Sequence, residues 1–223
     1  MKRDSKPAKP SKPAKVAKPR GRPRSFDREQ ALEHAMEVFW RKGFEAASLA
    51  DLTEAMGINP PSLYAAFGDK ERLFLEALDR YQAKQGDSCP YAEEPTAKGA
   101  IRRLLTYMAD DLTCCTHPRG CMMVMAAATS SDCSPRMQAV LAKRRAEGRG
   151  KIRQRIELGV KEGELPPETD AGGLADFYLT IVSGMALQAR DGASRKSLMA
   201  TVESAMRAWP ASAKGAAREK AAA

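Results

Sequence analysis

The chain has 223 residues, of which 43% are hydrophobic, 6% aromatic and 29% charged, a composition typical of a helical globular protein with one large or two modest domains. Its longest hydrophobic run, from Cys121 to Ala128, excludes a membrane-spanning helix of about 20 apolar residues. The formal charge is +9, and residues 1–24 account for all of it with ten cations against one anion. Because the basicity is confined to one end, we expect a polyanionic partner such as nucleic acid.

Residues 1–24 are predicted to form a disordered basic arm, since their Lys-Pro and Lys-Pro-Ala units offer almost nothing to bury. The arm ends in Arg20-Gly21-Arg22-Pro23, which matches the core of an AT-hook, a motif whose extended Arg-Gly-Arg lies in a narrow A·T minor groove. We therefore expect Arg22 and Arg24 to contact DNA. The alternative is a tail that only improves solubility.

Two helices are predicted directly after the arm. Apolar residues recur every three or four positions from Asp27 until Gly43, which we expect to end the first helix. Ser48 is a candidate N-cap with Asp51 three residues later, and Gly57 is expected to end this second helix. The pattern predicts two helices packed through their apolar faces.

A third, short helix follows only two residues after the second. Asn59 can cap it, and Pro60 and Pro61 suit its first turn because their missing N–H groups cost nothing there. Asp69 is the expected cap of a fourth helix that continues to about Tyr81. A helix, a glycine turn and a short helix within about twenty residues is the helix-turn-helix arrangement, in which the second helix enters the major groove of DNA.

The residues of this region resemble the TetR/AcrR family of transcriptional regulators. The resemblance rests on Phe44-Glu45-Ala46-Ala47-Ser48, on Met56-Gly57-Ile58, and on the stretch Ser62-Leu63-Tyr64-Ala65-Ala66-Phe67-Gly68-Asp69-Lys70-Glu71. It is strongest over residues 26–74. It implies an all-α protein, with an N-terminal three-helix helix-turn-helix domain and a larger C-terminal helical domain for ligand binding and dimerisation.

The expected domain layout follows from the resemblance and from the breaks in the helical pattern. We place the DNA-binding domain at residues 25–86, the ligand-binding and dimerisation domain at 87–210, and a flexible tail at 211–223. Prolines and candidate N-caps predict five helices in the second domain, at 96–115, 120–130, 134–163, 170–190 and 194–209, with Ser134, Asp170 and Ser194 as caps.

The resemblance also implies which residues bind the operator. Tyr64 and Lys70 would hold phosphates, although Tyr64 could instead be a packed aromatic and Lys70 a solvated surface charge. Ser48 is a further candidate DNA contact, and base reading would fall to exposed positions of the third helix, namely Asn59, Pro60, Pro61, Ser62 and Ala65. The family often has Lys, Gly and His at the positions of Pro60, Pro61 and Ala65, so this surface offers fewer hydrogen-bond donors than usual.

A palindromic operator needs a two-fold symmetric protein, so we expect a homodimer. The resemblance implies that the last two helices form the interface, and their apolar residues are the candidates: Phe177, Tyr178, Ile181, Met185, Leu198, Val202 and Trp209. The alternative is that these residues form only the core of one protomer.

A small-molecule inducer is expected to bind inside the C-terminal helices. The candidate walls of its pocket are apolar, with several methionines that adapt to varied ligand shapes: Met108, Leu112, Met122, Met125 and Phe177. They could equally be ordinary core residues. An inducer would relieve repression by favouring a conformation of the dimer in which the two DNA-binding domains are spaced more widely.

The five cysteines allow a different kind of sensing. Their odd number and irregular spacing indicate reduced thiols in a cytoplasmic protein, the five being Cys89, Cys114, Cys115, Cys121 and Cys133. The region around Cys114, Cys115 and Cys121 also contains His117 and several methionines, which suits Cu(I) binding or an activated thiol. A thiol- or Cu(I)-responsive repressor is therefore an alternative. The spacing is no zinc signature, and we predict no bound metal and no cofactor.

Enzymatic function is excluded by the motifs that are missing. The chain has no P-loop, no G-x-S-x-G sequence and no glycine-rich dinucleotide turn. A nucleoid-type protein that binds DNA of any sequence through the basic arm is a second alternative. We predict instead a cytoplasmic one-component regulator. It represses transcription by binding a palindromic operator in double-stranded DNA as a dimer and is released by an unidentified small molecule.

Overall fold

The protein is all-α over the part of the chain that the computed structural model describes, which comprises residues 26–88, 93–128 and 135–211. Its helices in chain order are α1 (Arg28–Ala46), α2 (Leu49–Met56), α3 (Pro60–Phe67), α4 (Lys70–Ser88), α5 (Ala97–Leu112), α6 (Met122–Ala128), α7 (Pro135–Lys161), α8 (Ala171–Arg190) and α9 (Arg195–Arg207). No strand occurs among these residues, which confirms the predicted fold class. The basic arm with Arg22 and Arg24 lies outside the described residues, as do Ser134 and positions 212–223.

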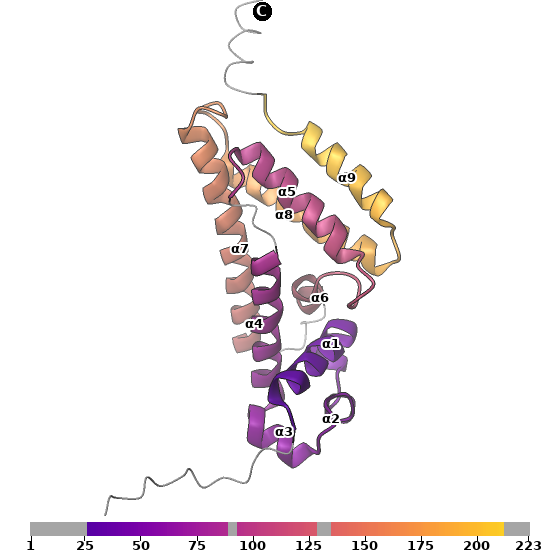
Figure 1. Cartoon of the computed structure of the whole chain (residues 1–223). Helices are drawn as coiled ribbons and strands as arrows, with labels where there is room; N and C mark the ends of the chain where they lie inside the picture. The colour runs from indigo at the N-terminus through magenta and orange to yellow at the C-terminus, as the bar shows by residue number, and fades with distance from the viewer. Residues whose placement is uncertain (1–25, 89–92, 129–134, 212–223) are drawn as a thin grey trace, which may run out of the picture.

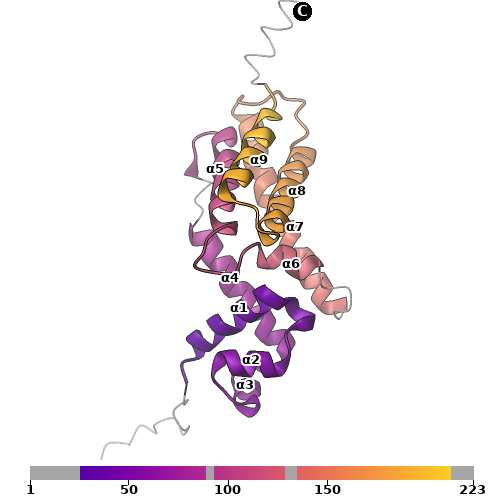
Figure 2. The ribbon, with the colours of Figure 1, turned by 90° about the vertical axis from the view of Figure 1, so that its right-hand side faces the viewer.

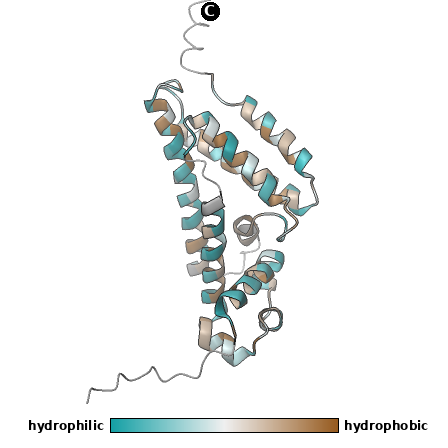
Figure 3. Ribbon diagram, in the orientation of Figure 1, coloured by the Kyte–Doolittle hydropathy of each residue, from teal (hydrophilic) through white to brown (hydrophobic). Residues whose placement is uncertain are grey.

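The helices form an elongated molecule with α1, α2 and α3 at one end and α5, α8 and α9 at the other (Figure 1). The long helices α4 and α7 both run along its length and meet at Arg144 of α7, whose guanidinium lies 2.6 Å from Asp79 of α4 (Figure 1). Helix α6 lies between the two ends (Figures 1 and 2). Hydrophilic residues predominate along α4 and α7 (Figure 3). Helix α4 directly follows α3, the predicted recognition helix, and therefore reaches from the DNA-binding end into the C-terminal half.

Local capping sets the ends of the short helices at the predicted residues. The Ser48 hydroxyl accepts a hydrogen bond from Asp51 N at 3.1 Å, and the Asp51 carboxylate accepts one from Ser48 N at 3.0 Å, which completes a capping box. Gly57 ends α2 in the left-handed conformation at φ 64°. Asn59 caps α3 by accepting from Ser62 N at 2.9 Å.

The first helix departs from prediction at its end. Gly43 does break the helix, with φ 78° and ψ 176°, but the chain resumes helical geometry and α1 runs on to Ala46. The extra turn places the Phe44 ring in the core, 5.1 Å from the Phe74 ring centroid on α4 and 6.3 Å from that of Phe39. Burial of this aromatic cluster explains why the helix continues beyond the glycine.

Two C-terminal helices begin at the predicted caps Asp170 and Ser194, and α5 begins after Thr96, the residue at which the sequence predicts the start of a helix. Thr96, Asp170 and Ser194 each accept a hydrogen bond from a backbone N–H three residues later, at Gly99, Gly173 and Ser197. The clearest difference lies in α5, which ends at Leu112 three residues before its predicted end. Cys114 and Cys115 therefore lie in the loop that leads to α6.

One buried cluster runs from α1 to α9. No helix within the described ranges is both long and apolar enough to span a membrane.

Candidate DNA-binding surface and ligand cavity

The recognition helix α3 has one buried and one exposed side. Leu63 and Phe67 are buried against the domain core, while Tyr64 is 47% exposed. Asn59, Pro60, Pro61 and Ala65 are also exposed and Ser62 is half-buried, so the predicted base-reading residues share the outward side of the helix with Tyr64. Tyr64 is thus no packed aromatic, and its hydroxyl is available at the surface.

Lys70 is positioned by the end of α1. Its ammonium donates a hydrogen bond to the Glu45 carbonyl at 3.3 Å and lies 4.6 Å from the centroid of the Phe44 ring. These contacts hold a half-buried cation in the first turn of α4. A cation held in place near the exposed side of the helix-turn-helix suits a phosphate contact better than a freely solvated lysine does.

Ser48 is exposed at the start of α2, where its hydroxyl oxygen already accepts the capping hydrogen bond from Asp51 N. The hydroxyl proton remains available to an external acceptor such as a phosphate oxygen. Asp51 itself is 2.7 Å from the Lys42 ammonium. Hydrogen bonding from Lys42, followed by that from Ser48, lowers the pKa of Asp51 from 3.8 to about 2.

Charged contacts fix α3 and α4 against α1. The Arg28 guanidinium lies 4.4 Å from the Phe67 ring centroid on α3 and donates to Glu76 on α4 at 2.5 Å. Arg80 on α4 donates to Glu29 at 2.6 Å and to Glu33 at 2.5 Å on α1. The recognition helix α3 and the helix α4 that continues into the C-terminal half are therefore both anchored on α1.

Trp40 lies where the two halves of the molecule meet. Its ring stacks on His117 at 4.7 Å between centroids and meets Tyr81 edge-on at 4.8 Å. The guanidinium of Arg190, at the end of α8, donates to the Trp40 carbonyl at 3.1 Å and also to that of Arg41. Two carbonyl groups of α1 just before its break at Gly43 are thus capped by the C-terminal domain.

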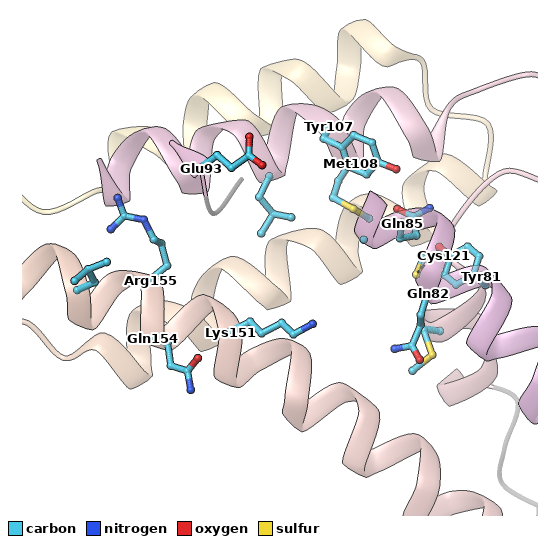
Figure 4. Close-up of a pocket in the computed structure, with 14 residues that line it drawn as sticks. Tyr81, Gln82, Gln85, Glu93, Tyr107, Met108, Cys121, Lys151, Gln154 and Arg155 are labelled. Carbon is cyan, nitrogen blue, oxygen red and sulfur yellow. Dashed lines mark hydrogen bonds between the residues drawn. The ribbon is translucent and has the colours of Figure 1, made fainter. Parts of the chain in front are cut away.

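A cavity of about 780 Å³ lies among α4, α5, α6 and α7 (Figure 4). Its lining mixes apolar, amide and charged side chains: Tyr81, Gln82, Gln85, Gly86, Glu93, Leu104, Tyr107, Met108, Cys121, Met123, Lys151, Gln154, Arg155 and Leu158. A second cavity of about 430 Å³ lies at the junction and shares Tyr81, Gln85 and Tyr107 with the first. Both volumes fall within the range typical of small-molecule sites, about 300–1,000 Å³.

Of the predicted ligand residues, only Met108 lines the larger cavity. Leu112, Met122 and Met125 are buried core residues that do not line it, and Phe177 lies on α8 beside a different hollow. None of the polar residues that line the cavity was among the predicted ligand residues. One signal for it existed in the spacing of Lys151, Gln154, Arg155 and Leu158, which share one face of α7.

Most of the predicted dimer residues are buried within a single protomer. Tyr178 is fully buried and its hydroxyl donates to the Ala205 carbonyl at 3.3 Å, which ties α8 to α9. The buried members are Tyr178, Met185, Leu198, Val202 and Trp209. Phe177 is 38% exposed and Ile181 is half-buried, and α8 also exposes Leu187 at 46%.

The three described cysteines differ in environment and are free thiols. Cys114 Sγ lies 3.1 Å from the Thr116 hydroxyl, whose hydrogen bond lowers the pKa of the thiol, whereas burial raises the pKa of Cys121. Cys115 is exposed. Within the described residues no three His, Cys, Asp or Glu side chains form a group that could hold a metal ion. Cys89 and Cys133 lie outside this part of the chain.

Comparison with known proteins covers both halves of the chain. The family model described as bacterial regulatory proteins of the tetR family matches residues 31–77, and a tetracyclin repressor-like C-terminal domain matches residues 98–205. The transcriptional repressor ComR of Escherichia coli is 39% identical over 196 residues, 86% of this chain and 93% of that protein. The repressor BdcR of the same organism is 35% identical over 193 residues, 81% and 88% of the two chains.

Solved structures that resemble this chain also belong to TetR-family regulators. A cysteine mutant of the TetR family transcriptional regulator CifR, complexed with 26-bp double-strand operator DNA, is 45% identical with a TM-score of 0.81, and the match covers 85% of this chain and 100% of that one. A putative TetR regulator from Rhodococcus is 38% identical with a TM-score of 0.57, covering 82% and 100%. This chain belongs to the TetR family of bacterial regulatory proteins.

Proposed function

We propose that the protein is a one-component transcriptional repressor that binds a palindromic operator as a homodimer and is released by a small-molecule inducer. The observation that carries this function is the similarity along both domains to CifR, whose structure contains operator DNA. ComR and BdcR, each matched over more than four fifths of this chain, are both named repressors, which favours repression over activation.

The DNA contacts divide into two groups. Tyr64, Lys70 and Ser48 bind phosphates and set the register of the protein on the duplex. Base edges are read by the outward residues of α3, which offer one or two hydrogen bonds and apolar contacts to thymine methyl groups: Asn59, Pro60, Pro61, Ser62 and Ala65. Arg22 and Arg24 add a minor-groove contact with a preference for A·T.

The homodimer forms through the outer side of α8. Phe177 and Leu187 are exposed apolar side chains on this helix, and Ile181 is half-buried between them. Burying such residues against a second copy removes apolar surface from water, whereas Tyr178 and Val202 are already buried and serve the protomer core. The proposal therefore centres the interface on Phe177, Ile181 and Leu187.

The inducer occupies the larger cavity and acts through α4. Tyr81, Gln82 and Gln85 on α4 line that cavity, and the same helix begins with Lys70 beside the reading unit. A ligand that binds more tightly when α4 is displaced favours a conformation in which the two DNA-binding domains of the dimer no longer match the operator. The size of this shift depends on the difference in ligand affinity between the two conformations. A cytoplasmic location suits both the DNA partner and the free thiols.

The two alternative functions are not favoured. A thiol- or Cu(I)-responsive site at Cys114, Cys115 and Cys121 would need these residues to act together, but Cys121 is buried and accepts a hydrogen bond from the Tyr81 hydroxyl at 3.3 Å. A DNA binder indifferent to sequence is disfavoured by the similarity to regulators along both domains. The relatives are regulators, and we assign no catalytic residue.

The dimer is tested by sedimentation and operator titration of the Phe177→Glu variant. Placing a carboxylate at the centre of the proposed interface is expected to yield monomers and to weaken operator binding by at least about tenfold. Ala142→Glu is the control, because it adds the same charge at an exposed position of α7. A Phe177→Glu protein that stays dimeric would contradict the proposed interface.

A further inference from the structure

We propose that the larger cavity selects an organic anion, namely an apolar molecule with an aromatic or branched body and a single carboxylate or similar acidic group. This inference rests on the proposed function, because it names the chemical class of the inducer.

One end of the cavity is apolar. Met108, Cys121 and Tyr81 line it, and each of these side chains is less than a tenth exposed. Leu104 and Met123 extend the apolar wall. Methionine and tyrosine side chains of this kind accommodate a hydrophobic ring and exclude water around it. The apolar body of a ligand would lie at this end.

Cationic side chains enter from α7. Lys151 extends from this helix into the space between the walls (Figure 4). Its ammonium makes no hydrogen bond or ion pair to any residue in the described part of the chain. Lys151 is exposed, so water screens its charge in the empty cavity. A ligand whose apolar body displaces this water would strengthen the attraction between the ammonium and an anionic group.

Arg155 lies one helical turn after Lys151 and is only 8% exposed. Its Nη2 donates to the Glu94 carbonyl at 3.1 Å, but its buried Nη1 has no hydrogen-bond partner and lies 3.9 Å from the Glu162 carboxylate. A buried donor without an acceptor destabilises the protein. Because Nη1 is buried, a ligand carboxylate would supply the missing acceptor after a rotation of the guanidinium toward the cavity.

The remaining groups around the cavity leave this positive charge in excess. Glu93 is the carboxylate of the lining and is exposed, whereas Glu162, 3.9 Å from Arg155 Nη1, does not line the cavity. Among the lining residues, two cations therefore face one anion. Burial raises the pKa values of Tyr81 and Cys121, which keeps both neutral at pH 7. Gln85 already donates to Asp111 at 2.8 Å, and the Gln82 oxygen accepts from Arg144 at 2.6 Å, which leaves the Gln82 amide as a further donor for an anion.

The test compares probes of one shape and different charge. Binding of 2-naphthoate, 2-naphthamide and 2-naphthylmethylammonium to the full-length protein is measured by calorimetry at pH 7.5. We expect 2-naphthoate to bind at least about tenfold more tightly than the amide, a difference of about 1.4 kcal/mol, and the ammonium compound to bind most weakly.

Two variants show whether α7 causes the preference. Lys151→Met retains the length of the side chain and removes its charge, so the preference for naphthoate over the amide should fall to about threefold or less. Lys143→Met is the matched control, because this lysine lies on the same helix, is 79% exposed and does not line the cavity. Its preference should equal that of the unmodified protein.

Several results would overturn the inference: equal or tighter binding of the amide, tightest binding of the ammonium compound, no binding of naphthoate at millimolar concentration, or an unchanged preference in Lys151→Met. Operator affinity is measured on the same samples by fluorescence anisotropy without probe. Specific operator binding together with no preference for naphthoate would refute the anion site alone, whereas equal binding to operator and scrambled DNA would refute the proposed function whatever the probes do.

Discussion

The indole Nε1 of Trp40 donates a hydrogen bond of 3.0 Å to the carbonyl oxygen of Gly120. Trp40 belongs to α1 of the DNA-binding domain, and Gly120 to the loop between α5 and α6, so the bond joins residues eighty positions apart. Gly120 has φ 87°, and a Cβ built there would lie 3.1 Å from the Ala186 carbonyl. The close approach of α8 therefore favours glycine at this position.

Replacing Trp40 by phenylalanine should destabilise the fold. The change leaves the buried Gly120 carbonyl without its donor, which costs about 1–3 kcal/mol of unfolding free energy. Urea unfolding followed by circular dichroism measures the loss. Trp209→Phe should cost less, because the Trp209 indole nitrogen makes no hydrogen bond to any described residue. An unchanged free energy in Trp40→Phe would show that the bond contributes nothing.

Removing the Tyr64 hydroxyl should affect DNA binding but not stability. The side chain is 47% exposed, so Tyr64→Phe should leave the unfolding free energy within about 0.5 kcal/mol. The loss of a hydrogen bond to a charged phosphate should weaken operator binding by about tenfold or more. Anisotropy titration at fixed salt gives the affinity. An affinity equal to that of the unmodified protein would remove Tyr64 from the contact surface.

The salt dependence of binding tests Lys70. If each protomer places this ammonium on one phosphate, Lys70→Met should reduce the log–log salt slope by about 0.9 for each contact, or about 1.8 for the dimer. Affinities at several salt concentrations provide the slope. The control is Lys143→Met, an exposed lysine of the C-terminal half, which should not change it. A slope unaltered by Lys70→Met would contradict the phosphate contact.

Deleting residues 1–24 should flatten the same salt slope and reduce any preference for A·T-rich flanks. The segment contains ten cations, and an AT-hook-like arm would place some of them along the minor groove. The Arg22→Ala/Arg24→Ala double variant separates the motif from the rest of the arm. If the deletion changes solubility but leaves the slope intact, the arm is only a solubilising tail.

The capping box of α2 predicts a pH dependence. The pKa of Asp51 in the folded protein is lowered from 3.8 to about 2, so the charged form is favoured by folding. Its contribution to stability is complete above about pH 4 and is lost as the pH falls through 2. The difference in unfolding free energy between the unmodified protein and Asp51→Asn should therefore shrink over this interval. A difference that is constant from pH 6 to pH 2 would contradict the shift.

Helix ends and the DNA-reading unit could be predicted from the sequence because their causes are local. Ser48, Asn59 and Asp170 satisfy backbone N–H groups only three residues away, so residue type and spacing suffice to place them. For Tyr64 the family resemblance implied a surface role, and the side chain is 47% exposed. Such signals need no knowledge of the tertiary structure.

The cavity could not be predicted in the same way, because its lining depends on how α4, α5, α6 and α7 face one another. Leu112 and Met122 are apolar and buried as expected, yet they pack in the core rather than beside the cavity. Hydrophobic periodicity indicates that a residue is buried but not what covers it. Lys151 and Arg155 are charged residues of α7, and only the packing of the helices places them at the cavity.

The most direct test of the repressor function is binding of the full-length protein to DNA from its own upstream region, compared with a scrambled duplex of the same composition. Fluorescence anisotropy at physiological salt measures both affinities. We predict binding of two protomers to one upstream site and a preference over scrambled DNA of about 10³ or more. Equal affinity for the two duplexes would contradict the account and would favour a protein that binds DNA of any sequence through its basic arm.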